Sequence, residues 1–186
     1  FSKEKEAKAA INRSIDQFEK IDYVIHCAGA VGSGCLSDTS LDEWYKILDI
    51  NLTSAFLLCR EAYPILKKTS GSVVLLSSIN GTHGGSNVSG PVYAISKAGI
   101  NNMTRYLAKE WAKDNIRVNC VSPGPVDTPM LDRLTLEQHK NAKAATLLGK
   151  YSTAEECAGL IVFLCSPWAQ SMTGTIENIS SGIVLD

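Results

Sequence analysis

The sequence predicts an α/β fold in which an open parallel sheet is wrapped by helices. Segments with helical periodicity alternate with short apolar runs along the whole chain, which is the pattern of β-α-β units. The apolar runs end at small or turn-forming residues, as strands do where a crossover connection begins. With 186 residues the chain is long enough for one core and short for two. We therefore expect residues 1–186 to form a single domain.

The composition excludes several kinds of function. Hydrophobic residues make up 45% of the chain and the net charge is −1, so no basic surplus attracts nucleic acid. The longest strongly apolar run, 160–165, is far shorter than the ~20 residues that span a bilayer, so no membrane anchor is expected. Six cysteines without a Cys-x-x-Cys pair predict reduced thiols in a cytoplasmic protein, and three scattered histidines predict no metal site.

The first segments predict a helix at 2–19 and a short buried strand at 21–26. Apolar residues recur in the helix at intervals of three and four, and the strand stops at Cys27-Ala28-Gly29. A helix that leads into a strand is the second half of a β-α-β unit. Since Phe1 is no initiator residue either, we expect that residues have been removed or that the sequence is partial.

A long helix is predicted for 40–68, with Ser40 as its N-cap and Glu43 completing a capping box. The middle of this helix is apolar nearly all round, and Asn51 interrupts it at a position that should be buried. A buried amide must be hydrogen-bonded, so Asn51 is either a structural bracket or part of a site. The residues alone favour the bracket. A strand at 72–76 follows.

The stretch 77–97 carries the expected chemistry. It leaves the 72–76 strand through a loop rich in Gly, Ser and Asn and enters a helix that Pro91 can open and that ends near Asp114. Tyr93 and Lys97 lie four residues apart on one face of this helix. A nearby ammonium lowers the pKa of a phenol by ~1–3 units. Such a tyrosine can exchange a proton with a carbonyl or an alcohol while a loop serine holds the same oxygen.

A second pair with this spacing, Tyr63 and Lys67, shows that the spacing alone is weak evidence. Pro64 lies inside this pair, and no serine-bearing strand end precedes it. We therefore interpret Tyr63 as part of a solvated helix end.

The last third predicts strands at 116–121 and 175–179, and a helix from Ser152 to Leu164 with Glu155 in its capping box. A stiff loop with three prolines follows the first of these strands, and the next segment is polar and weakly helical, as a mobile lid would be. Ligands bind beyond the carboxyl ends of parallel strands. The strand ends should therefore converge with the tyrosine on one crevice.

Together these motifs resemble those of the short-chain dehydrogenase/reductase family. The resemblance implies a Rossmann-type, doubly wound parallel sheet that is incomplete at the N-terminus. It also implies an NAD(P)-dependent oxidoreductase that interconverts an alcohol and a carbonyl by hydride transfer. The matching pieces occur in the family's order over essentially the whole chain: Ala28-Gly29, the phrase Asp-Ile-Asn-Leu-Thr-Ser-Ala-Phe at 49–56, Ser77-Ser78, Tyr93-x-x-x-Lys97, the phrase at 116–124 with Thr128, and Thr173-Gly174.

The resemblance also implies a role for individual residues. Tyr93 would be the acid/base, and Ser78 would orient the substrate oxygen. Lys97 would bond the nicotinamide ribose and lower the tyrosine's pKa, while Asn51 would anchor a proton-relay water, which replaces the bracket interpretation. NAD or NADP would also meet Pro123, Gly124, Val126 and Thr128 at its nicotinamide end, and Ala28 and Gly29 on its adenosine side.

Three departures from the family pattern matter. His26-Cys27 replaces the usual Asn-Asn, which removes an amide that ties strands together. The serine-to-tyrosine loop is slightly long, so Ser77 stays a second candidate for the serine role. No Gly-x-x-x-Gly-x-Gly precedes Ile21, so we expect this polypeptide to bind NAD(P) weakly, which titration with NADH tests. Without that unit the strand at 21–26 becomes an exposed sheet edge.

Two function classes stay open: an oxidoreductase of which this chain is the C-terminal two-thirds, or a truncated, inactive module for dimerisation or interaction. The apolar excess on 40–68 and 91–114 resembles the paired helices of the family and implies a homodimer or homotetramer. A small alcohol or ketone is the implied substrate, bounded by 84–92 and 130–151. In that second segment Arg133 and His139 are candidate contacts for an anion, although lid residues of this kind are usually solvated.

Overall fold

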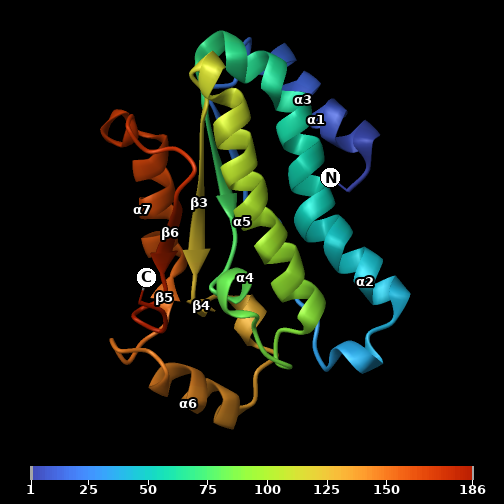
Figure 1. Cartoon of the computed structure of the whole chain (residues 1–186), viewed down its shortest axis with the longest axis vertical. Coiled ribbons are helices and arrows are strands. Elements are labelled where there is room, and N and C mark those ends of the chain that lie inside the picture. The colour runs from blue at the N-terminus through green and yellow to red at the C-terminus, as the bar shows by residue number, and fades with distance from the viewer. Residues whose placement is uncertain (1, 186) are drawn as a thin grey trace.

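The computed structural model describes residues 2–185 and has the predicted α/β architecture (Figure 1). Its main sheet is parallel and has the order β1-β2-β3-β6. The register pairs Val24 with Val73 and Val74 with Asn119, which aligns the carboxyl ends of the strands at one edge of the sheet. The four strands are β1 (Tyr23–His26), β2 (Ser72–Leu76), β3 (Arg117–Pro123) and β6 (Ile176–Ile179).

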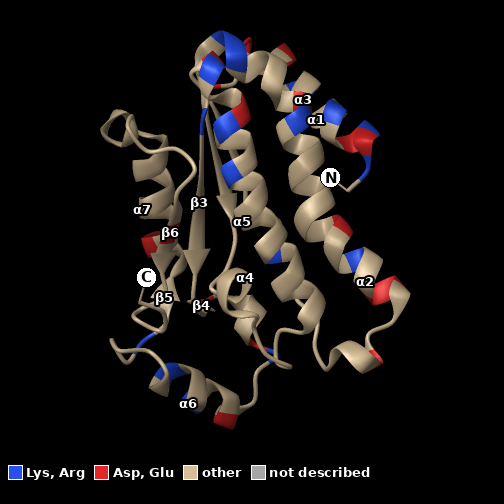
Figure 2. Ribbon diagram, in the orientation of Figure 1, with Lys and Arg blue, Asp and Glu red and all other residues tan. Residues whose placement is uncertain are grey.

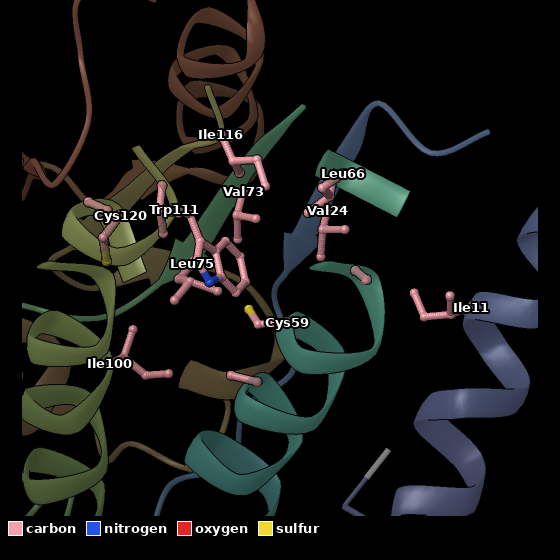
Figure 3. Packing of buried hydrophobic residues seen from close by; sticks show 14 residues of the cluster. Ile11, Val24, Cys59, Leu66, Val73, Leu75, Ile100, Trp111, Ile116 and Cys120 are labelled. Carbon is pink, nitrogen blue, oxygen red and sulfur yellow. The ribbon is translucent and has the colours of Figure 1, made fainter. Parts of the chain in front are cut away.

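Helices cover both faces of this sheet, which confirms the doubly wound arrangement (Figure 1). One face carries α1 (Glu4–Phe18), α3 (Ser54–Thr69) and α5 (Pro91–Trp111), and the other carries α7 (Ala154–Cys165). Figure 3 shows the larger core between the sheet and the first group of helices, where Leu75 lies beside Trp111 and Leu66 lies beside Val24. Burial of such side chains contributes ~1.5–3 kcal/mol each and fixes the helices on the sheet.

The predicted helix at 40–68 is in fact two helices joined by a π-helical turn. These are α2 (Leu41–Leu48), the turn Asp49–Thr53, and α3. The Ser40 hydroxyl accepts the backbone N–H of Glu43 at 3.1 Å, which confirms the predicted N-cap. Turns of the π type are rare and occur often at functional sites. The turn contains Asn51, which is completely buried.

The polar segment after β3, which was predicted to be weakly helical, contains α6 (Leu136–Ala144). Several short elements were not predicted, among them a four-residue helix, α4 (Asn80–His83), that follows β2. The two-residue strands β4 (Val126–Asp127) and β5 (Ser152–Thr153) pair in parallel. The capping box of α7 is built from Thr153 and Glu156, one residue later than predicted. Single turns of 3-10 helix lie at Leu36–Asp38, Ala112–Asp114, Pro129–Leu131 and Pro167–Ala169.

Strand β1 forms one edge of the sheet, as the sequence predicted. Its alternate residues Val24 and His26 are buried, but Tyr23 is 52% exposed and Ile25 is 47% exposed. The expectation that the whole strand is buried was therefore wrong, because the side chains on one of its faces remain exposed. Charged residues occur on the outer surfaces of α1, α2 and α6 (Figure 2). Within the described chain no helix combines the length and apolarity needed to cross a membrane.

Candidate active site

A cavity of about 710 Å³ opens at the carboxyl ends of β2 and β3. Its walls come from these strand ends, the first turns of α5, the segment after β3 and one side of α7. The site residues predicted from the sequence that line it are Gly29, Ser77, Ser78, Tyr93, Lys97, Pro123, Gly124, Val126 and Thr128. Two predicted residues do not line the cavity: Ala28, which is exposed, and Asn51, which lies behind it.

Lys97 is held rigidly at the floor of the cavity. Its ammonium donates to the backbone carbonyl of Leu76 at 2.7 Å, and the residue is only 3% exposed. Burial lowers its pKa to about 8, because a desolvated ammonium favours the neutral form. The ammonium lies over the ring of Tyr93, 5.6 Å from its centroid. A helical spacing of four residues thus places both functional groups in one cavity.

The two candidate serines differ in what their hydroxyls do. Ser77 donates its hydroxyl proton to the backbone carbonyl of Lys97 at 2.9 Å, which ties the end of β2 to α5. The Ser78 hydroxyl lies close enough to the Tyr93 phenol to lower its pKa, and its oxygen accepts the backbone N–H of Asn80 at 3.2 Å. Of the two serines, only Ser78 influences the pKa of the tyrosine in this way.

The expectation that Lys97 lowers the pKa of Tyr93 is wrong for this structure. Burial raises the pKa of Tyr93 above its usual value, and the hydrogen bond to Ser78 and the charge of Arg133 oppose that rise. The reason is geometric: the ammonium is directed to the Leu76 carbonyl and lies over the ring face. The phenol is accordingly protonated at neutral pH and is a proton donor.

Asn51 brackets two segments by its side chain. Its oxygen accepts the backbone N–H of Ala30 at 2.7 Å, and its amide donates to the Ala30 carbonyl at 2.9 Å and to the Ser96 hydroxyl at 2.8 Å. Ser96 in turn donates to the Tyr93 carbonyl at 2.7 Å. The loop after β1 is thus fixed to the turn of α5 that carries the tyrosine. The residues alone predicted such a structural bracket for Asn51, whereas the family resemblance implied that its side chain anchors a proton-relay water.

Sequence reasoning missed how His26 acts. Its Nε2 lies 2.7 Å from the Ser54 hydroxyl, and Ser54 donates to the carbonyl of Ile50 inside the π turn. His26 occupies the position where the family pattern has an asparagine that ties neighbouring strands together. Its ring therefore still connects β1 to another element, but that element is helix α3 and not a strand. Burial and the charge of Lys97 lower the pKa of His26 to about 4. The replacement of the family's asparagine by His26 could have indicated that the hydrogen bond at this position differs, but it does not identify Ser54 as the partner.

Of the two residues predicted as contacts for an anion, Arg133 and His139, only Arg133 lines the cavity. Arg133 lines the cavity, and its guanidinium donates to the Val88 carbonyl at 2.6 Å across the opening. His139 faces away and pairs with the hydroxyl of Tyr151 at 3.0 Å. Both predicted walls are confirmed, since residues of 84–92 and of 130–151 line the cavity. Side chains of α7 complete the cavity wall, and the sequence did not predict this, because the pattern of a helix face does not show which part of the chain packs against it. These side chains are Ala154, Cys157, Ala158 and Ile161.

The second tyrosine–lysine pair lies outside the cavity. Tyr63 donates to the carboxylate of Asp114 at 2.6 Å and stacks on Trp111 with ring centroids 4.9 Å apart. Lys67 pairs with the same carboxylate at 2.9 Å. The interpretation of a solvated helix end holds for Lys67, whose side chain is 55% exposed, but not for Tyr63, which is half-buried against the core.

The residues at the cavity fit the nicotinamide end of a dinucleotide cofactor. Lys97 uses one of its three N–H donors within the chain and lies at the cavity floor, where a ribose hydroxyl can accept another. Apolar side chains such as Leu76, Pro123 and Val126 offer a surface for a flat ring. The chemistry of this donor set agrees with the resemblance stated from the sequence.

Comparison with known proteins extends this agreement over the chain. Residues 1–183 match the family described as enoyl-(acyl carrier protein) reductase. The chain is 33% identical to the 3-oxoacyl-[acyl-carrier-protein] reductase FabG of Thermotoga maritima, covering 96% of this chain and 72% of that protein. It is 34% identical to trans-4-hydroxycyclohexanecarboxylate dehydrogenase of Sinomonas cyclohexanicum, over 94% of this chain but only 64% of that protein.

A solved structure agrees in three dimensions. The short-chain dehydrogenase/reductase "SDR:Glucose/ribitol dehydrogenase" from Brucella melitensis superposes with a TM-score of 0.93 at 31% identity. The match covers 100% of this chain and 74% of that one. The chain therefore spans roughly two-thirds to three-quarters of the length of the proteins it resembles.

Proposed function

This chain belongs to the short-chain dehydrogenase/reductase family of NAD(P)-dependent oxidoreductases, and on that premise we propose that its cavity interconverts a small alcohol and the corresponding carbonyl compound. The observation that carries the proposal is that the side chains of Tyr93 and Ser78 lie in one cavity beside the buried ammonium of Lys97. These three groups share one cavity at the carboxyl edge of the sheet.

In the reducing direction, Tyr93 donates its phenolic proton to the carbonyl oxygen. NAD(P)H supplies the hydride to the carbonyl carbon when it is bound. The residues that would hold its nicotinamide end are Lys97, Pro123, Gly124, Val126 and Thr128. The raised pKa of Tyr93 keeps the proton on the phenol until transfer, and the positive charge of Arg133 and the Ser78 hydroxyl then stabilise the phenolate. The alcohol is oxidised by the reverse steps.

We assign the substrate-orienting role to Ser78 over Ser77. The Ser77 proton is already donated to the Lys97 carbonyl, so that hydroxyl has no proton for a substrate oxygen. The Ser78 hydroxyl lies next to the phenol, so both can contact the same oxygen.

We propose that the substrate is an anionic hydroxy or oxo compound, such as a hydroxycarboxylate. Arg133 places a guanidinium in the cavity wall within electrostatic reach of Tyr93. No Asp or Glu is among the described residues that line this cavity, so an anion there meets no like charge. The name of the Sinomonas cyclohexanicum relative, trans-4-hydroxycyclohexanecarboxylate dehydrogenase, gives a compound of this class as that protein's substrate.

We also propose that two copies pair through the outer faces of α2, α3 and α5. Large apolar side chains remain exposed there, and a partner subunit would remove them from water. They are Leu41 (70% exposed), Tyr45 (59%), Phe56 (47%), Ile95 (44%) and Tyr106 (64%).

The two tyrosines provide a matched test of the function. Tyr93→Phe should reduce kcat by about 10²-fold or more, because general acid–base catalysis of this kind contributes 10²–10⁴-fold, while thermal stability changes little. Tyr63→Phe should leave kcat unchanged and lower thermal stability slightly, because a hydrogen bond to a carboxylate is lost. Equal activity of the two variants on secondary alcohols and hydroxycarboxylates would refute the proposal and favour an inactive interaction module.

A further inference from the structure

Asn80 is a polar residue of the active-site cavity that the chemistry described above does not use. It is the first residue of α4 (Figure 1), it follows Ser78 by two positions, and it lines the same cavity. Its backbone N–H donates to the Ser78 hydroxyl oxygen at 3.2 Å. Asn80 is thereby held next to the serine that we assign to the substrate oxygen.

The hydrogen bonds of Ser89 fix the orientation of the Asn80 amide. Ser89, which is 6% exposed, donates its hydroxyl proton to the carbonyl of Ser86 at 3.2 Å. Its oxygen can then only accept, and it lies 3.0 Å from Nδ2 of Asn80. The nitrogen of the amide therefore faces Ser89, and the oxygen, Oδ1, is the free end.

This free oxygen is open to a ligand. Oδ1 of Asn80 has no hydrogen-bond partner within residues 2–185, and the residue is half-buried. It is not one of the polar atoms that are buried without a partner in this part of the chain, so it is accessible. Because Asn80 lines the active-site cavity, a ligand in that cavity can reach the oxygen. One fixed acceptor in a largely apolar wall discriminates between ligands.

The charge of the cavity decides which hydrogen-bond donor suits this oxygen. An amide oxygen only accepts, so the matching group on a ligand is a donor, either a hydroxyl or an ammonium. Lys97 and Arg133 line the cavity, and no Asp or Glu is among its described lining residues, so an ammonium is repelled. A neutral hydroxyl group is the donor that fits.

We propose that Asn80 is a specificity-determining residue, which selects substrates that carry a second hydroxyl group on the carbon next to the reacting one. The inference rests on the proposed function, because Ser78 holds the reacting oxygen. Since Asn80 is bonded directly to that serine, its amide oxygen meets the neighbouring substituent of the substrate. The reduced form of the substrate is then a vicinal diol, and the oxidised form is an α-hydroxy carbonyl compound.

Two pairs of compounds that differ by one hydroxyl group test this selection. They are 2,3-butanediol with 2-butanol, and glycerate with lactate, and the neutral pair makes the test independent of Arg133. In each pair the diol should have a kcat/KM about 3- to 10-fold higher, which is the factor that one neutral hydrogen bond contributes.

Three variants assign the preference to the amide oxygen. Asn80→Ala should remove it. Asn80→Asp keeps an acceptor oxygen and should retain the preference within the neutral pair. The control is Asn87→Ala, which alters an exposed residue outside the cavity and should retain the preference in both pairs. Loss of the preference in both Asn80 variants would show that the residue acts only on the structure of the loop.

Ligand-observed NMR on the whole 186-residue protein separates this inference from the proposed function, because it needs no turnover. Glycerate should bind with a Kd about 3- to 10-fold lower than that of lactate, and the difference should vanish in Asn80→Ala. A binding preference without turnover would support the role of Asn80 and refute the proposed function. Turnover without a preference for the diol, or equal or undetectable binding of glycerate and lactate, would overturn the role of Asn80.

Discussion

The imidazole of His26 donates its Nε2 proton to the hydroxyl of Ser54, 2.7 Å away. The direction of this bond follows from its neighbour, since Ser54 already donates its own proton to the carbonyl of Ile50 at 2.5 Å. The other ring nitrogen, Nδ1, is buried and has no partner within the described chain. The histidine is therefore neutral, and it connects β1 to the π turn that contains Asn51.

This bond predicts that the protein loses stability in mild acid. The pKa of His26 falls from 6.5 to about 4 on folding, so the unfolded chain binds the extra proton between these values. Stability is complete above pH 6.5 and declines as pH falls toward 4, by about 3 kcal/mol over the window. Urea unfolding at several pH values should show a shallower decline in His26→Gln, whose amide keeps the donor but does not titrate.

The control is His83→Gln, which changes an exposed histidine. That variant should follow the wild-type pH dependence. An unchanged slope in His26→Gln would mean that other groups cause the acid sensitivity.

Lys97 predicts a further rise of stability with pH, in the alkaline range. Its pKa is lowered to about 8, so between pH 8 and its ordinary value of 10.5 the unfolded chain binds more protons and stability rises with pH. Buried thiols such as Cys59, whose pKa is raised, oppose this trend, so only a difference between variants isolates it. In the wild type, Lys97 should raise the free energy of unfolding by about 3 kcal/mol between pH 8 and 10.5, and Lys97→Met should lack this contribution. Lys8→Met, on the exposed side of α1, should retain it.

Asn51→Leu should destabilise the fold by about 2–4 kcal/mol, because Ala30 and Ser96 lose buried hydrogen-bond partners. Denaturant unfolding measures this, and Asn12→Leu on the exposed side of α1 is the control, with a change within about 0.5 kcal/mol. A stable Asn51→Leu protein that has lost activity would contradict the bracket and support a role in proton transfer.

Arg133→Met should separate substrates by charge. The KM for a hydroxycarboxylate should rise about tenfold, while kcat/KM for a neutral secondary alcohol should stay near the wild-type value, because only the anion loses an ionic contact. Steady-state kinetics on both substrates measures the split. A parallel loss on both would assign Arg133 to positioning the loop through its bond to Val88.

The chain's local signals predicted most of the fold. Alternation of apolar runs and amphipathic segments gave all four strands of the main sheet within two residues, and the parallel order follows from the crossovers. The Ser40 cap was readable because its partner is three residues away. The cap of α7 was misplaced by one residue, because Ser152 with Glu155 and Thr153 with Glu156 both have the capping-box spacing and the local pattern does not distinguish them.

The sequence by itself determined that Tyr93, Lys97 and the serines after β2 share one edge of the sheet, since the carboxyl ends of parallel strands meet there. Only the tertiary structure decided what each group does. Ser77 is committed to a carbonyl twenty residues away, and Ser78 is left to the phenol. The ammonium turns to the Leu76 carbonyl, and burial then raises the pKa of the tyrosine. Residue types and spacing place groups near one another, but hydrogen-bond partners and desolvation arise from contacts between distant segments, which no local pattern encodes.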